Sequence, residues 1–171
     1  MITIRPESAE DEAGVRRVNE RAFPTAAEAD IVDALRANCP DVVSLVAEEN
    51  ARIVGHILFS PAVLATPGNE LRGMGLAPMA VLPERQDRGI GTALVRAGLD
   101  LLRQRGCPFV IVLGHPAYYP RFGFEPASRF GIRPQWDDVP SEAFMICFLE
   151  PPGDRAVAGV ARYRDEFNAA I

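Results

Sequence analysis

The stretch LAPMAVLPERQDRGIGT, residues 76–92, decides how this chain folds. It leads from an extended apolar run through a proline and a polar loop with two glycines into a long helix. The helix is clear from its periodicity, because apolar residues recur at i, i+3, i+4 and i+7 from Ile90 to Leu102 and charged residues lie opposite them. Gly106 and Pro108 then end it. A strand, a glycine loop and a helix in this order predict an anion-binding site at the N-terminus of the helix.

The first turn of this helix offers N–H groups without a helical carbonyl partner and carries about half a positive charge. Gly89 and Gly91 omit the Cβ atoms that would block a close approach, and Arg85 and Arg88 add mobile positive charge. A tight turn with solvated arginines is the alternative interpretation of the glycines alone. A P-loop is excluded because the chain has no lysine, and a Rossmann fingerprint is disfavoured because Leu94 stands where a third glycine is required.

The hydrophobic pattern of the whole chain predicts a single α/β domain over residues 1–171 with a mixed sheet. Pro78 inside an extended run predicts a bulge or an edge strand. Helices are expected at residues 9–22 and 27–38, a short helical turn at 117–122 and a loop over 126–142. Strands are expected at residues 2–5, 42–48, 52–59, 71–82, 109–113, 144–149 and 159–163.

Composition limits the classes of function. With 171 residues, 48% of them apolar, the chain can bury a core without disulfides or metal. A net charge of −5 disfavours nucleic acid and anionic membranes as partners, and the absence of lysine excludes Schiff-base catalysis. Cys39, Cys107 and Cys147 form no CxxC pair, so we expect buried free thiols and no metal site. No apolar run approaches the length of a membrane span, so a cytoplasmic protein is expected.

The hexapeptide QDRGIG at residues 86–91 resembles the Q/R-x-x-G-x-G/A signature of GNAT-type N-acetyltransferases, whose loop amides hold the pyrophosphate of coenzyme A. The YPRFGF segment at residues 119–124 resembles the Y-x-x-x-G-F element of the same family. Residues 79–83 and 109–114 are similar to its fourth and fifth strands. The tract VLGHPAYYPRFGFEP is similar to the YhbS-like branch, and the likeness extends over nearly the whole chain.

The resemblance implies a mostly antiparallel mixed sheet, flanked by helices, whose fourth and fifth strands splay apart. It also implies acetyl-CoA as the cofactor, with its pantetheine arm paired to backbone groups of Met79 and Val81 in the splay. The implied reaction moves the acetyl group to a primary amine. The residues implied to hold the cofactor are Met79, Ala80, Val81, Gln86, Asp87, Arg88, Gly89, Ile90, Gly91 and Thr92.

The resemblance also assigns catalytic residues. Tyr119 lies four residues before Gly123 and matches the family tyrosine that protonates the leaving thiolate, and Tyr118 is the alternative if the register is off by one. The family glutamate on the fourth strand is absent before Met79, which leaves the base open. His115 follows the fifth strand and is a candidate for the general base, because imidazoles exchange protons near neutral pH. The alternative is that His115 is a turn residue without a catalytic role. The other histidine, in a strand interior, is expected to pack.

For the acceptor, Glu28 matches a glutamate in the similar branch, and with Asp30 and Asp33 it makes an acidic region that favours a cationic small molecule. A solvated helix face is the alternative. Trp136, with Asp137 and Asp138, is expected to rim the acceptor site. A homodimer is possible by resemblance, and small-molecule amines are the expected substrates. Two other functions stay open, an acyl-CoA sensor without turnover and a nucleotide-binding protein.

Overall fold

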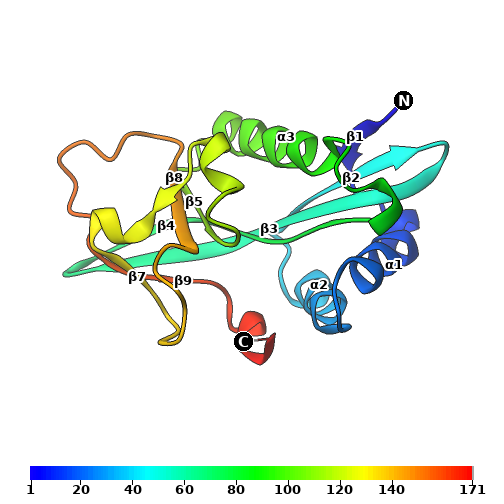
Figure 1. The fold of residues 1–171 in the computed structure, drawn as a ribbon. Helices are drawn as coiled ribbons and strands as arrows, with labels where there is room; N and C mark the ends of the chain where they lie inside the picture. The colour runs from blue at the N-terminus through cyan, green and yellow to red at the C-terminus, as the bar shows by residue number, and fades with distance from the viewer. Residues whose placement is uncertain (171) are drawn as a thin grey trace. The chain divides into compact units, whose positions relative to one another are not determined.

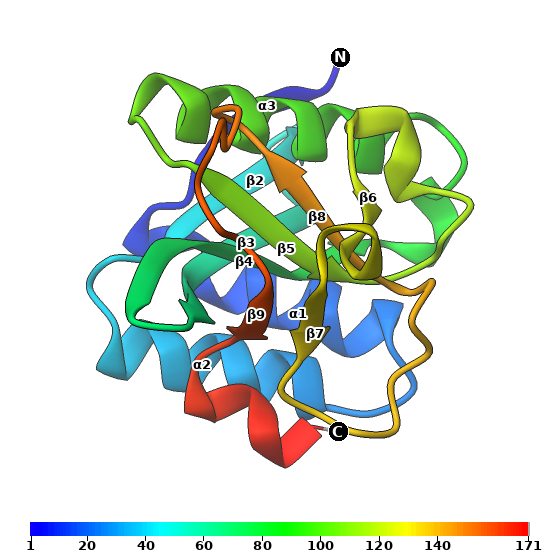
Figure 2. The same ribbon diagram turned by 90° about the vertical axis from the view of Figure 1, so that its left-hand side faces the viewer.

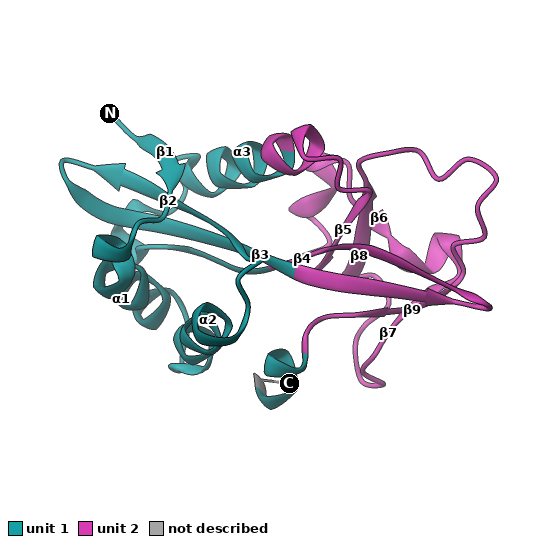
Figure 3. Ribbon diagram, turned by 180° about the vertical axis from the view of Figure 1, so that it is seen from behind, with its two compact units in different colours: residues 1–60, 77–99, 165–171 teal, residues 61–76, 100–164 magenta. Residues whose placement is uncertain are grey.

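The computed structural model describes residues 1–170 and divides into two compact units (Figure 3). Unit 1 contains residues 1–60 and 77–99 and the segment from Asp165 onward, and unit 2 contains residues 61–76 and 100–164. The expectation of a single domain over residues 1–171 stays a prediction. Among the described residues, no helix has the length and the apolar run that crossing a bilayer requires.

The strands form the mixed sheet that the sequence predicts, in the order β1-β2-β3-β4-β5-β8-β6, with β9 beside β3 and β7. Most pairings are antiparallel, whereas β4 with β5 and β7 with β9 are parallel. The strands are β1 (Thr3–Pro6), β2 (Val43–Glu49), β3 (Arg52–Thr66), β4 (Asn69–Val81), β5 (Phe109–Leu113), β6 (Glu125–Pro126), β7 (Ile132–Pro134), β8 (Phe144–Phe148) and β9 (Gly159–Arg162). The helices are α1 (Glu12–Ala22), α2 (Ala27–Asn38) and α3 (Ile90–Gln104).

In unit 1, helices cover both faces of the strands β1, β2 and the first part of β3. Figure 1 shows α1 and α2 on one face and the start of α3 on the other. The apolar face of α3 is buried, and Gly55 of β3 lets it approach, since a Cβ there would lie 3.0 Å from side-chain atoms of Ile90 and Leu94. Close packing of this helix on β3 places its N-terminus at the end of β4, because only the short segment 82–89 joins them.

In unit 2, β5 is the central strand. It pairs in parallel with residues 74–76 of β4 and antiparallel with β8, which in turn pairs with β6 (Figure 2). The side chains of β5 from Phe109 to Val112 are buried, as the continuous apolar run predicts for a strand covered on both faces. The strand β9 pairs with residues 63–65 of β3 and, in parallel, with β7.

Some sequence predictions are wrong. Residues 126–142 are not a continuous loop, because they include the 3-10 helix Ala127–Phe130 and the strand β7. Such short segments carry no periodicity, and β7 is stabilised by pairing with β9, which is distant in sequence. The strand β3 continues past Phe59 and through Pro61 to Thr66. A 3-10 helix, Asp165–Ala170, was not expected, and the thiol of Cys107 is only half-buried.

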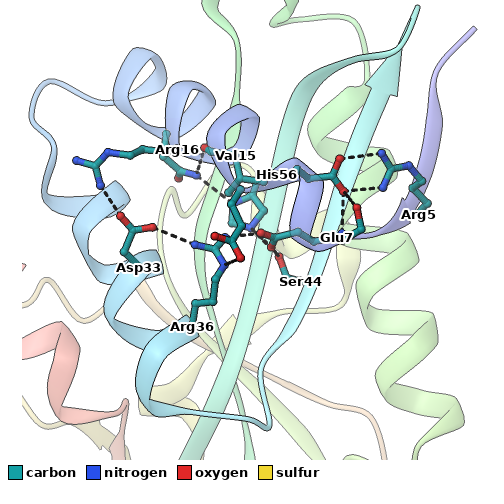
Figure 4. Close-up of polar contacts among 12 residues, drawn as sticks. Arg5, Glu7, Val15, Arg16, Asp33, Arg36, Ser44 and His56 are labelled. Atoms are coloured by element: carbon teal, nitrogen blue, oxygen red, sulfur yellow. Dashed lines mark hydrogen bonds and ion pairs between the residues drawn. The ribbon is translucent and has the colours of Figure 1, made fainter.

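A chain of polar contacts in the core of unit 1 links α1 to β2 and β3 (Figure 4). Asn19 on α1 donates from Nδ2 to the carbonyl of Val15 (3.0 Å) and to Nδ1 of the fully buried His56 (3.0 Å). An amide nitrogen only donates, so Nδ1 accepts and the ring proton sits on Nε2. That nitrogen then donates to Oγ of Ser44 (2.9 Å).

The network ends at two charged side chains. Ser44 donates from Oγ to the carboxylate of Glu7, and the guanidinium of Arg36 also pairs with that carboxylate. Burial lowers the pKa of His56 to about 3, and the nearby Arg36 charge acts in the same direction. Both ring nitrogens are satisfied in the neutral state, so His56 packs as expected and serves the fold.

We expect the free energy of unfolding to fall as the pH drops from about 7 to about 5. The unfolded chain binds a proton at His56 below its ordinary pKa of 6.5, whereas the folded protein binds it only near pH 3. The loss over this interval is about 2 kcal/mol. Denaturant unfolding at several pH values measures it. His56→Gln should remove this pH dependence, while His115→Gln, at the other histidine, should keep it. Equal slopes for wild type and His56→Gln would contradict the prediction.

Candidate functional site

The segment between β4 and α3 has an unusual backbone. Asp87 and Gly89 both adopt left-handed conformations, with φ of 61° and 82°. The helix starts directly afterwards, because the amide of Ala93 donates to the carbonyl of Gly89 (3.0 Å). Left-handed residues in a turn gather successive N–H groups into an anion-binding concavity. A Cβ on Gly89 would meet no protein atom within 4 Å, so the space above it is open.

Of the two arginines in this loop, one is held in an ion pair and the other is exposed to solvent. The expectation that Arg85 is mobile is wrong, because its Nε lies 2.6 Å from Oε2 of Glu49. This ion pair lowers the pKa of the Glu49 carboxyl. Arg88 is exposed and makes no ion pair within the described residues. The first turn of α3 contains no acidic side chain. Arg88 and the helix N-terminus are therefore the positive groups that remain for an anion.

The expected cofactor residues gather in unit 1. Met79, Ala80 and Val81 end β4, with Met79 half-buried and the other two buried. Gln86 ties the loop to this strand end, because its Nε2 donates to the carbonyl of Val81 (3.1 Å). The loop residues Gln86, Asp87, Arg88 and Gly89 are exposed, and Ile90, Gly91 and Thr92 form the first turn of α3.

Tyr119 lies in unit 2, at the start of the 3-10 helix Tyr119–Phe122. Its ring lies on the backbone of Gly114, where a Cβ would come within 2.4 Å of Cε2. Its edge-to-face contacts with Tyr118 (5.1 Å between centroids) and Phe124 (5.6 Å) hold the ring in place. Burial raises the pKa of Tyr119 well above its ordinary value. Within the described residues its hydroxyl makes no hydrogen bond, but its oxygen is not one of the buried polar atoms that lack a partner.

The two neighbouring candidates lie differently. Tyr118 is half-buried, and its ring contacts the guanidinium of Arg121 at 4.6 Å. The side chain of His115 is exposed, while its carbonyl accepts from the amides of Tyr118 (3.0 Å) and Tyr119 (3.4 Å). The structure therefore places His115 and Tyr119 in one turn after β5.

The acidic region on α2 is mostly neutralised. Asp30 and Asp33 pair with Arg16 at 3.0 Å and 2.6 Å, and Asp33 also pairs with Arg36 at 3.0 Å. Glu28 differs, because its Oε2 atom is buried and has no hydrogen-bond partner within the described residues. Asp30 and Asp33 are thus partly neutralised, whereas Glu28 has a carboxylate oxygen without a partner.

Trp136 in unit 2 stacks on Tyr163, with ring centroids 5.8 Å apart and planes 26° apart. The hydroxyl of Tyr163 donates to the carbonyls of Leu76 (3.0 Å) and Ile111 (3.3 Å). Sequence reasoning missed Tyr163 as a site residue, since a lone tyrosine at the end of a short strand has no distinguishing pattern. Within the described residues, no group of three or more His, Cys, Asp or Glu could hold a metal ion.

Comparison with known proteins agrees with this geometry. The family model described as acetyltransferase (GNAT) domain matches residues 3–127. YhbS of Escherichia coli K12, described as an uncharacterized N-acetyltransferase, is 35% identical over 168 residues, 98% of this chain and 99% of YhbS. The crystal structure of E. coli YhbS in complex with CoA has a TM-score of 0.90 at 34% identity and covers 98% of this chain and 92% of that chain. A GNAT acetyltransferase from Brucella melitensis, in complex with acetyl-CoA, has a TM-score of 0.79 at 36% identity, covering 98% of both chains. The chain thus belongs to the GNAT family of acetyltransferases.

Proposed function

We propose that this protein transfers the acetyl group of acetyl-CoA to a primary amine of a small-molecule acceptor. The protein is an N-acetyltransferase by its family, and its structural relatives hold CoA and acetyl-CoA. The observation that supports the proposal most directly is the loop before α3, with left-handed Asp87 and Gly89 and open space above Gly89.

The loop fits the pyrophosphate of coenzyme A. Helix geometry leaves the amides of Ile90 and Gly91 without a carbonyl four residues back, so they are donors for an anion. Arg88 adds a positive charge that no carboxylate neutralises by an ion pair within residues 1–170. We infer that residues 86–92 bind the pyrophosphate and that backbone groups of Met79 and Val81 bind the pantetheine arm.

Acetyl-CoA supplies an activated thioester, in which a C–N bond replaces the C–S bond during transfer. The departing sulfur gains a proton, and Tyr119 is our candidate to donate it from its hydroxyl. A phenol is already protonated at neutral pH, and this hydroxyl makes no hydrogen bond to the described residues. Burial raises the pKa of Tyr119 further, so the donation depends on the position of the hydroxyl and not on its acidity. The proton therefore stays on Oη until a developing thiolate attracts it.

The acceptor nitrogen must lose a proton to become a nucleophile. We propose His115 as the group that receives it, directly or through water, because its imidazole is exposed in the turn that also carries Tyr119. For recognition of the acceptor we propose Glu28, whose buried Oε2 has no partner within the described residues and matches an ammonium group. Trp136 is proposed to border the acceptor site.

Release of free CoA in the presence of a panel of small amines tests the function as a whole. A time-dependent thiol signal that needs both acetyl-CoA and an amine supports N-acetyl transfer. Binding of acetyl-CoA without turnover on any amine would instead indicate an acyl-CoA sensor.

Gly89→Ala should weaken the binding of acetyl-CoA by ~1–3 kcal/mol, because the new methyl group occupies the space above the loop and disturbs charge-assisted hydrogen bonds. Gly106→Ala is the matched control, since Gly106 also has a positive φ (75°) and a Cβ there would meet no atom within 4 Å. Both variants should lose about 1–2 kcal/mol of stability from the left-handed backbone. Calorimetry should show a raised Kd for Gly89→Ala alone. Equal Kd values for the two variants would remove the anion site from this loop.

Tyr119→Phe should lower kcat by ~10²-fold while the Kd for acetyl-CoA stays within about twofold, because the hydroxyl acts in the transition state and the ring still packs on Gly114. Steady-state kinetics and calorimetry measure the two values. Tyr118→Phe is the control and should be nearly silent. A large loss in Tyr118→Phe instead would move the proton donor to the neighbouring tyrosine.

Glu28→Gln should raise the KM for a cationic amine by ~10-fold or more, because a charge-assisted hydrogen bond is lost, while the KM for acetyl-CoA stays unchanged. Asp30→Asn removes the same charge from the same helix, but from a side chain that already pairs with Arg16. It should leave the amine KM within about twofold. Equal effects of the two variants would show a general electrostatic effect and exclude Glu28 as the binding group.

A further inference from the structure

Tyr163 follows β9 in unit 2 and is held at several points. Its ring lies on the backbone of Gly75, where a Cβ would come within 2.5 Å of Cε1. Trp136 stacks on the ring, and the amide of Tyr163 donates to Oε1 of Gln135 (2.6 Å). The side chain is buried, so neither the ring nor the hydroxyl can move far without displacing these groups.

The hydroxyl of Tyr163 joins two strands. Its proton is shared between the carbonyl of Leu76 on β4 and the carbonyl of Ile111 on β5. These two strands pair in parallel over three residue pairs only, and the last of these pairs is Leu76 with Val112. So short a ladder is weak by itself, and the phenol adds a link between the two strands at its end.

Ile111 is close in sequence to the support of Tyr119. Three residues after Ile111 comes Gly114, and the ring of Tyr119 lies so close to its backbone that only glycine fits there. A shift of β5 at Ile111 is therefore carried to the ring of Tyr119. Burial is the main cause of the raised pKa of Tyr163, and the neighbouring Tyr119 acts in the same direction.

We propose that Tyr163 is a positioning residue for acetyl transfer, which holds the middle of β5 at Ile111 and so helps to set the place of the Tyr119 hydroxyl. The proposal rests on the function given above, in which Tyr119 donates the proton. Tyr163 touches neither cofactor nor acceptor in this role. It acts through Tyr119, because a donor misplaced by a fraction of an ångström transfers its proton less well.

Tyr163→Phe tests the role in kinetics, because it keeps the ring that packs on Gly75 and removes only the hydroxyl. We expect kcat to fall by ~10-fold while the KM for acetyl-CoA stays within about twofold. In the Tyr119→Phe background the same change should have no further effect on kcat, since the group it positions is gone. A loss of stability with normal kcat, or additive losses in the double variant, would overturn the proposal.

A second measurement does not depend on turnover. The chain has three tyrosines, so the variant Tyr118→Phe/Tyr163→Phe retains Tyr119 alone, and its ionisation is followed by absorbance at alkaline pH. If Tyr163 positions Tyr119, the pKa of Tyr119 in this variant should be lower than in Tyr118→Phe, because a shifted phenol is better hydrated. In Tyr118→Phe alone, both remaining phenols should keep raised pKa values. An unchanged, strongly raised pKa of Tyr119 in the double variant would overturn the proposal. If wild type binds acetyl-CoA but acetylates no amine, the proposed function fails, and this titration still decides whether Tyr163 positions Tyr119.

Discussion

Aromatic rings that lie directly on glycine backbone are the contacts on which the interior depends. In unit 2 the ring of Tyr119 rests on Gly114 and that of Tyr163 on Gly75, and a Cβ at either glycine would come within 2.4 Å or 2.5 Å of the ring. Atoms cannot approach so closely, so a larger residue would push each tyrosine away from its strand. The same kind of contact joins α3 to β3 in unit 1, where Gly98 faces Phe59. These contacts hold the rings against the backbone by packing, and at Tyr163 two hydrogen bonds of the hydroxyl are added.

Buried polar atoms in this protein differ in whether the fold supplies them with a partner. Both ring nitrogens of His56 and the hydroxyl of Tyr163 are engaged by neighbouring groups, so they bind parts of the protein to one another. Among the proposed site residues, Glu28 has a buried oxygen, Oε2, that has no hydrogen-bond partner among residues 1–170. An unpartnered buried polar atom costs stability, which is tolerated where a substrate supplies the missing partner.

Charged side chains also differ in whether another side chain of the protein pairs with them. Arg85, Asp30 and Asp33 are used up in ion pairs that stabilise unit 1, although their positions beside the loop and on α2 pointed to ligands. Of the charged residues proposed to bind ligands, Arg88 forms no ion pair within the described residues, and Glu28 keeps a buried oxygen without a hydrogen-bond partner there. A surface ion pair contributes little stability, yet it removes a charge from the set that a ligand can use. The charge available to substrates is therefore much smaller than the composition alone suggests.

The sequence alone determined the order of strand, glycine loop and helix and the position of the loop, because periodicity, glycine and proline act within a few residues of chain. The choice of Tyr119 came from the family resemblance of residues 119–124 and stays a prediction. The extra strand β7, the pairing of Arg85 with Glu49 and the isolation of Glu28 among paired acids were decided by the tertiary structure. So was the role of Tyr163, which bonds to Leu76 and Ile111 far away in the chain. Such partners meet only when distant segments pack together, and no local pattern records which atoms will face one another.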